Sequence, residues 1–167
     1  HFGDYEPKRM GAHHELVFPV GTFKGPQGWI VVLCLDLQWP NFCNALGRPD
    51  LIDDPRYKTM PERAARRHEL IELTETWIAT FATDADLIAH LESFRVPCSP
   101  VLSPTDAIGH PHYEARDMVR WVDDPLAGKV PIPGYPFKFG AQPQLPDLTA
   151  PTLGQHNAEV LGDRLGM

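Results

Sequence analysis

Eighteen prolines, unevenly spread over 167 residues, constrain the fold of this chain more than any other feature. Proline fixes φ and lacks a backbone N–H, so it interrupts helices and is excluded from central strands. None falls between residues 62 and 96, whereas residues 142–151 form a proline-rich linker. The chain therefore divides into a first part that can hold long helices and, from about residue 113, a second part that is extended.

Several short segments have the residue pattern of β-strands: residues 18–23, 29–35, 96–102, 118–122 and 129–139. The first two lie on either side of a Gly-rich connection, which predicts a hairpin. Helical segments lie between the second and third, so the sequence predicts an α+β fold.

The longest predicted helix covers residues 62–82. Its apolar residues recur at steps of three and four and form one stripe: Leu70, Leu73, Trp77 and Phe81. Thr83 with Asp86 forms a capping box that starts a second helix, which runs to residue 94. Shorter helices are predicted in three places: residues 38–46 with Gly47 as the C-terminal cap, the segment after Ser103, and the C-terminus, where Val160, Leu161 and Leu165 are apolar.

Composition excludes some classes of protein. The formal net charge is −7, which argues against a protein that coats nucleic acid. No apolar run approaches the roughly 20 residues of a membrane span. The three cysteines are odd in number and lack metal-type spacing, which is typical of reduced thiols, so we expect a cytoplasmic protein. The chain starts HFGDYEPKRM, without an initiator Met, and we expect it to be a piece of a longer protein.

No group of side chains forms a complete catalytic set. Histidines occur close together at His13–His14 and at His110 and His112, but no Cys or acid at ligand spacing accompanies them, so no metal site is predicted. Two aspartate pairs, at residues 53–54 and 123–124, are each followed by proline and predict turns.

Two further features have structural interpretations. The arginines Arg63, Arg66 and Arg67 are interpreted as a solvated face of the long helix. Cys98 lies between prolines in RVPCSPVLSP, with no base at a catalytic offset, and is interpreted as a small buried residue.

Five segments, in order, resemble motifs of the family III CoA-transferases, the group of formyl-CoA transferase and carnitine-CoA transferase. They read RMGAHHELVFPVGTFKGPQGWIVV, WPNFCNALGRPDLIDDPRY, the stretch around Arg63, RVPCSPVLSPTDAI and APTLGQHNAEVL. The chain departs from the family pattern at Gln27, where Asp is usual, at Ser99, where Gly is common, and at residues 155–157.

The resemblance implies an enzyme that moves CoA between carboxylic acids. In the family, a nucleophilic aspartate forms mixed-anhydride and aspartyl-CoA intermediates, and coenzyme A takes part as a thioester substrate, not as a tightly bound cofactor. That aspartate lies on a Rossmann-like large domain in the N-terminal half, so no catalytic residue is expected in this chain. The resemblance also implies an interlocked homodimer.

By the same resemblance, residues 1–112 are the small α+β domain with an N-terminal linker. Residues 113–167 are an extended, proline-rich segment that returns to the large domain and ends in a helix. The loop before the first strand of the small domain faces the active site in the family. The residues that correspond to it are His14, Glu15, Leu16, Val17, Phe18, Pro19, Val20 and Gly21. Some members have a glycine run there that gates the acyl intermediate, whereas this chain has the bulkier Leu16, Val17 and Phe18.

Two alternatives remain open on sequence alone. A 2-methylacyl-CoA racemase of the same fold would abstract an α-proton with a His/Asp pair in the absent half. A binding or assembly module would carry no catalysis. Neither the acyl donor nor the acceptor can be identified from these residues.

Overall fold

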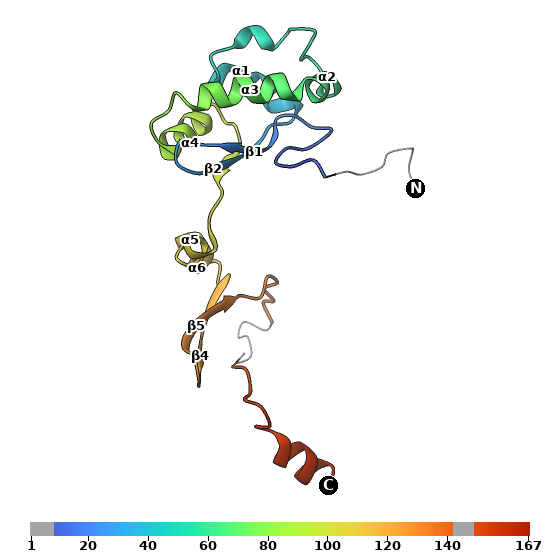
Figure 1. The fold of residues 1–167 in the computed structure, drawn as a ribbon, viewed down its shortest axis with the longest axis vertical. Helices are drawn as coiled ribbons and strands as arrows, with labels where there is room; N and C mark the ends of the chain where they lie inside the picture. Colours follow the sequence, from blue (N-terminus) through green and yellow to red (C-terminus); the bar gives the residue numbers. More distant parts are fainter. Residues whose placement is uncertain (1–8, 142–148) are drawn as a thin grey trace, which may run out of the picture. The chain divides into compact units, whose positions relative to one another are not determined.

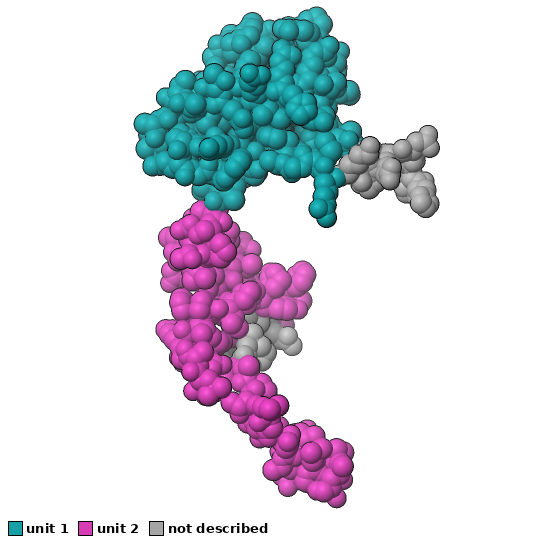
Figure 2. Space-filling model, in the orientation of Figure 1, with its two compact units in different colours: residues 1–101 teal, residues 102–167 magenta. Residues whose placement is uncertain are grey.

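The computed structural model describes residues 9–141 and 149–167. It divides into two units, residues 1–101 (unit 1) and residues 102–167 (unit 2), which Figure 2 colours separately. Helices and antiparallel strands occupy separate segments of the chain, so the predicted α+β class is confirmed. None of the helices in these described ranges is both long and apolar enough to cross a bilayer.

Unit 1 contains one three-stranded antiparallel sheet in the order β1-β2-β3. Strands β1 (Val20–Lys24) and β2 (Trp29–Leu33) form the predicted hairpin, and β3 (Cys98–Pro100) pairs with the other edge of β2. Along β2 the side chains alternate, because successive residues point to opposite faces of a sheet. Ile30 and Val32 are buried in the core, whereas Trp29 is half exposed.

Helices α1 (Trp39–Ala45), α2 (Met60–Ala65), α3 (Arg67–Ile78) and α4 (Asp84–Ser93) supply the rest of unit 1, with short 3₁₀ turns η1 (Asp36–Gln38) and η2 (Pro49–Leu51). In Figure 1 these helices gather on one side of the β1–β2 hairpin. The buried core lies between them and includes Phe18, Phe23, Phe42, Leu70, Leu87 and Leu91.

Two predicted helix ends are confirmed by their caps. Gly47 has φ +67°, and the N–H groups of Gly47 and Arg48 donate to the carbonyls of Asn44 and Cys43, which closes α1 with a Schellman motif. At α4, the Thr83 hydroxyl accepts the N–H of Asp86 at 3.1 Å. Both signals are local in sequence, which explains why they could be predicted.

The prediction of one helix over residues 62–82 is wrong. The chain breaks at Arg66 (φ −110°, ψ 22°), and the second helix, α3, ends at Ile78. The N–H of Arg66 is shared between the carbonyls of Glu62 and Arg63, so the last turn of α2 tightens before α3 begins. No proline or glycine marks this break.

The buried line of α3 also differs from the predicted stripe. Leu70 is buried as expected, but the other fully buried positions are Thr74 and Ile78. Thr74 is accommodated because its hydroxyl donates to the carbonyl of Leu70 at 2.6 Å. The remaining predicted members, Leu73, Trp77 and Phe81, are partly buried against the core.

Unit 2 contains helices α5 (Pro104–Ile108) and α6 (Pro111–Ala115), a two-stranded hairpin of β4 (Val119–Asp124) and β5 (Gly128–Pro133), and a C-terminal π-helix η3 (Ala158–Arg164). The helix after Ser103 and the C-terminal helix were predicted, whereas α6 was not. The strand predicted at residues 129–139 is too long, since β5 ends at Pro133. A Cβ at the next residue, Gly134, would lie 2.1 Å from the carbonyl oxygen of Asp117.

Candidate functional site

Residues 14–21, for which the sequence predicts a role in shaping an acyl pocket, form a turn that leads into β1. The N–H of His14 donates to the carbonyl of Val20 at 2.8 Å. One residue further out on each side, His13 and Gly21 form an isolated antiparallel bridge. A Cβ on Gly21 would lie 2.5 Å from the carbonyl oxygen of Ala12, so only glycine fits this close approach. The two ends of the loop are therefore held together.

The tip of the loop is organised by a side chain. The Nδ1 of His14 accepts the N–H groups of Leu16 and Val17, each at 3.1 Å. This arrangement satisfies two backbone donors that the turn would leave unpaired. Leu16 is 55% exposed, so the tip presents an apolar side chain to solvent.

The base of the loop belongs to the core. Phe18 is 0% exposed, and its ring packs edge-on against Phe23, with 6.2 Å between ring centroids. Pro19 is buried, and its carbonyl accepts the N–H of Cys34 at 2.8 Å. The Phe18–Pro19 peptide bond is cis.

The structure brings the eight predicted residues together in one loop but gives them different surroundings. His14 and Leu16 are exposed, and Phe18 and Pro19 are buried. The other four are partly buried: Glu15, Val17, Val20 and Gly21. Only the tip can therefore reach a ligand with its side chains. A contact with substrate stays a prediction for all eight.

His13 lies beneath this loop and has an unusual environment. Its ring packs on Phe23, with 4.7 Å between centroids, and its Nδ1 is buried without a hydrogen-bond partner among the described residues. Burial lowers the pKa of His13 below its usual value, with Glu75 acting in the opposite direction. The imidazole is therefore neutral at pH 7 and contributes as an aromatic ring.

Arg63 corrects the interpretation of the three arginines as a solvated helix face. Its side chain is 1% exposed, which makes it the largest buried charged group among the described residues. Its Nε donates to the carbonyl of Phe18 at 3.0 Å, in the loop described above. Arg66, by contrast, is exposed, and its side chain donates to the carbonyl of Arg56 at 3.4 Å, while Arg67 is partly buried.

The remaining donors of Arg63 are also satisfied, by the loop just before α2 and by Asp36. Nη1 donates to the carbonyls of Tyr57 and Lys58 at 3.0 and 3.3 Å, and Nη2 is paired with the carboxylate of Asp36. The guanidinium carbon lies 4.7 Å from the ring centroid of Trp39. A buried cation is tolerated when it is paired and hydrogen-bonded in this way.

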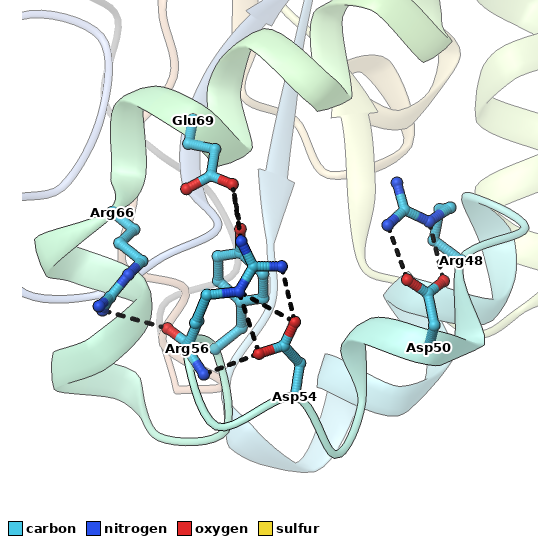
Figure 3. Close-up of polar contacts among 7 residues, drawn as sticks. Arg48, Asp50, Asp54, Arg56, Arg66 and Glu69 are labelled. Atoms are coloured by element: carbon cyan, nitrogen blue, oxygen red, sulfur yellow. Dashed lines mark hydrogen bonds and ion pairs between the residues drawn. The ribbon is translucent and has the colours of Figure 1, made fainter.

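A cluster of ion pairs covers the surface near the start of α3 (Figure 3). Arg56 donates to the carboxylate of Asp54, with 2.8 Å between Nη2 and Oδ2, and this hydrogen bond lowers the pKa of Asp54. Tyr57 donates its hydroxyl to Glu69, and burial together with this bond raises the Tyr57 pKa. Arg56 Nη1 also lies 3.5 Å from Oε1 of Glu69, so the cluster links α3 to the preceding loop, whereas Arg66 in the same view donates to the carbonyl of Arg56.

The remaining candidate side chains take structural positions. Asp54 and Asp124 accept backbone N–H groups two residues ahead, as the turn prediction requires. Cys98 is partly buried on β3, and burial raises its pKa to about 11, so it is a thiol and not a thiolate at neutral pH. Within residues 9–141 and 149–167, no three His, Cys, Asp or Glu side chains are grouped to hold a metal ion.

Comparison with known proteins decides the family. The sequence profile of CoA-transferase family III matches residues 1–157. The chain belongs to CoA-transferase family III. The resemblance inferred from the five motifs is therefore confirmed.

Individual relatives agree with this assignment. A succinyl-CoA:mesaconate CoA-transferase from Haloarcula hispanica is 34% identical over 94% of this chain and 39% of its own length. A formyl-CoA:oxalate CoA-transferase from Streptomyces avermitilis is 32% identical over 86% of this chain and 34% of its own. A CaiB/BaiF family protein from Brucella suis, known from its crystal structure, matches with a TM-score of 0.72 at 29% identity, over 95% of this chain and 41% of its own.

These matches also define what the chain covers. It spans between about a third and two fifths of the length of these curated relatives. Sequence reasoning found the loop through the family motif, but it missed Arg63 as the group that holds the loop. The available signal was weak: Arg63 lies within one of the matching segments, but its contacts with Phe18 and Asp36 span 45 and 27 positions of sequence.

Proposed function

We propose that the protein to which these residues belong is an acyl-CoA:carboxylate CoA-transferase. The observation that carries this proposal is the family III match over residues 1–157, together with relatives that are themselves CoA-transferases. Its substrates would be a CoA thioester and a free carboxylic acid. Coenzyme A would enter and leave as part of a substrate, with no tightly bound cofactor.

The proposed chemistry is nucleophilic catalysis by a carboxylate. An aspartate outside these 167 residues attacks the thioester carbonyl, which gives a mixed anhydride and releases CoA thiolate. The thiolate then attacks the aspartyl carbonyl, which gives an aspartyl-CoA thioester and frees the donor acid. The acceptor carboxylate repeats the two steps in reverse and leaves as the new CoA thioester. The greater length of the relatives supports placing the nucleophile outside this chain.

The contribution proposed for this chain is a wall of the acyl pocket. The tip of the loop presents the exposed side chain of Leu16, while Phe18 and Pro19 anchor its base. Anhydrides and thioesters are hydrolysed by water, so an apolar wall protects the transfer. Because the base is buried and hydrogen-bonded, we propose a fixed wall here in place of a glycine gate.

We further propose that unit 2 lies on the rest of the enzyme and that the complete protein is a homodimer. Apolar side chains of its C-terminal helix support the first proposal. Val160, Leu161 and Leu165 are 40%, 42% and 62% exposed. Side chains of this kind are expected to be covered by another surface.

Trapping of the intermediate tests the proposed function. The full-length protein is incubated with hydroxylamine in the presence and absence of an acyl-CoA, and activity is measured after removal of both. Inactivation only with acyl-CoA is expected, because hydroxylamine attacks an enzyme thioester or anhydride. No inactivation, accompanied by exchange of the substrate α-proton with solvent, would indicate a racemase and contradict the proposal.

A second test concerns this chain alone. Because the proposed nucleophile and most CoA contacts lie outside it, residues 1–167 should bind CoA weakly or not at all in calorimetry. Micromolar binding would contradict the proposal that most CoA contacts lie outside this chain.

A further inference from the structure

Arg63 is unusual because one buried side chain bonds to three separate segments of unit 1. Its donors reach the carbonyl of Phe18, two carbonyls in the loop before α2 and a carboxylate on η1. An apolar residue of similar volume could not satisfy the buried carbonyls of Phe18 and Tyr57 to which Arg63 donates. The arrangement therefore calls for a role that apolar packing cannot supply.

The contact with Phe18 has a direct structural consequence for the loop. On the side of the tip that leads into β1, the backbone is fixed by two successive carbonyl contacts. Phe18 accepts from Arg63 at 3.0 Å, and Pro19 accepts from Cys34 at 2.8 Å. On the other side, His14 is bonded to Val20. The exposed Leu16 is therefore carried between two fixed points.

We propose that Arg63 is a positioning residue for the acyl pocket: by holding the Phe18 carbonyl, it fixes the loop at residues 14–21 and with it the selectivity for the carboxylate. This inference rests on the proposed function, in which the loop forms one wall of that pocket. Arg63 itself does not reach the substrate, because its side chain is 1% exposed and its donors are directed at protein groups.

The local structure explains how Arg63 is presented. Helix α2 starts with a capping box in which Glu62 accepts the N–H and the hydroxyl of Thr59, at 2.9 and 2.8 Å. The N–H of Arg63 donates to the carbonyl of Thr59 at 3.0 Å. The cap thus sets the position from which the side chain enters the core.

Lysine cannot replace this arrangement. Guanidinium donors lie on fixed edges of a plane, so Nε can bond to Phe18 while Nη2 is paired with Asp36. An ammonium group is a single point and cannot span both partners. Arg63→Lys therefore keeps the positive charge but should release the Phe18 carbonyl.

Selectivity between two acceptors gives a readout that is independent of how much enzyme is folded. For the full-length protein, kcat/KM is measured with two carboxylate acceptors that differ by one methylene. A well-fixed pocket distinguishes one methylene by roughly 10-fold or more. In Arg63→Lys we expect this ratio to fall by about threefold or more, because a loosened wall defines the pocket less sharply.

Two controls separate positioning from simple loss of stability. Arg66→Lys makes the same change on an exposed neighbour and should leave both the ratio and the melting temperature unchanged. Leu91→Ala removes a buried side chain of α4, far along the chain from the loop, and should lower the melting temperature without altering the ratio. An unchanged ratio in Arg63→Lys, or an equal change in Leu91→Ala, would overturn the proposal.

Hydrogen exchange tests the same claim without activity. The amides of residues 14–21 should exchange about 10-fold faster in Arg63→Lys than in the wild type, and not in Leu91→Ala. If Arg63→Lys does not fold, Thr59→Ala, which weakens the cap that presents Arg63, should change both readouts in the same direction to a smaller degree. Unaltered exchange in the folded variant would overturn the positioning role. Absence of any CoA transfer by the wild type would instead count against the proposed function.

Discussion

Each of the two units of this chain is stabilised internally by a different kind of interaction. In unit 1, helices α1 to α4 pack on a three-stranded sheet, and every residue of the buried hydrophobic core among the described residues lies there. In unit 2, the hairpin of β4 and β5 and two short helices contain no buried hydrophobic side chain in the described ranges. Its order comes from backbone pairing and turns.

Both units use a cation to tie down a distant backbone carbonyl, and the difference between the two ties is instructive. The side chain of Arg63 is 1% exposed, although that of its partner Asp36 is 64% exposed. Two of the carbonyl contacts of Arg63, with Phe18 and Tyr57, are buried. Lys138 donates to the carbonyl and carboxylate of Asp117 at 2.9 and 3.0 Å, but its side chain is 40% exposed and that of Asp117 is 60% exposed. Water can take the place of Lys138 at Asp117, but it cannot reach the buried carbonyls of Phe18 and Tyr57 to take the place of Arg63. Unit 1 is therefore expected to keep its structure by itself, and unit 2 to depend on a covering surface.

The largest expected difference between the units is in cooperative unfolding, when each is expressed alone. Residues 9–101, expressed alone, should unfold cooperatively, because they contain the whole core. Residues 102–167 should show no cooperative transition, since an isolated two-stranded hairpin is at best marginally stable in water. Calorimetry with near-UV circular dichroism checks both. A sharp transition in the second piece would contradict the comparison.

The two cationic ties should differ strongly in free energy. Arg63→Met leaves the buried carbonyls of Phe18 and Tyr57 without a donor and should lower the free energy of unfolding by about 2–5 kcal/mol. Lys138→Met removes an exposed pair and should cost less than about 1 kcal/mol. Urea unfolding of the 167-residue chain measures both. Equal losses in the free energy of unfolding would show that burial does not make the Arg63 contacts stronger than those of Lys138.

Alkaline pH should weaken unit 1 through its three cysteine thiols. Cys34, Cys43 and Cys98 all lie there, and burial raises their pKa values to about 12, 12 and 11. In the unfolded chain these thiols ionise near pH 9, while the folded state keeps them neutral. Their stabilising contribution is therefore complete below pH 9 and is lost as the pH rises toward 11–12.

The measurement is urea unfolding at pH 8 and pH 10, where the free energy of unfolding should fall by at least about 1 kcal/mol. A triple cysteine-to-alanine variant is the control and should lose most of this dependence. The same dependence in that variant would show that other groups cause it.

The smallest expected difference is in the free energy of unfolding when equivalent helix caps are removed from the two units. Thr83 and Ser103 make the same bond, each accepting a backbone N–H at 3.1 Å from an aspartate three residues ahead. Thr83→Ala should cost about 1 kcal/mol, because α4 contributes Leu87 and Leu91 to the core. Ser103→Ala should leave global unfolding within about 0.5 kcal/mol, since α5 has no buried residue.

Local signals explain how much of the fold could be predicted from the sequence. The hairpin, the Gly47 cap and the Thr83 cap depend on residues a few positions apart, and these predictions are confirmed. The break at Arg66 and the end of α3 at Ile78 have no proline or glycine beside them and were missed. The short helix α6 was also missed, because its five residues include proline and histidine in no helical period.

The candidate site shows the same limit. The family motif located residues 14–21, but no periodicity indicates that Phe18 and Pro19 are buried or that Arg63 holds the loop. Arg63 contacts Phe18 across 45 positions of sequence and Asp36 across 27. Polar residues are usually exposed, so a helix that carries three arginines is reasonably interpreted as solvated until its packing is known.

Direct observation of CoA transfer tests the central claim, that this chain is part of a CoA-transferase. The full-length protein is incubated with an acyl-CoA and a second carboxylic acid, and all CoA species are quantified by mass spectrometry. The account predicts that the new thioester forms in a one-to-one ratio with the released donor acid, while total CoA thioester stays constant. Release of free CoA without a new thioester, or loss of the substrate α-proton to solvent without transfer, would contradict it.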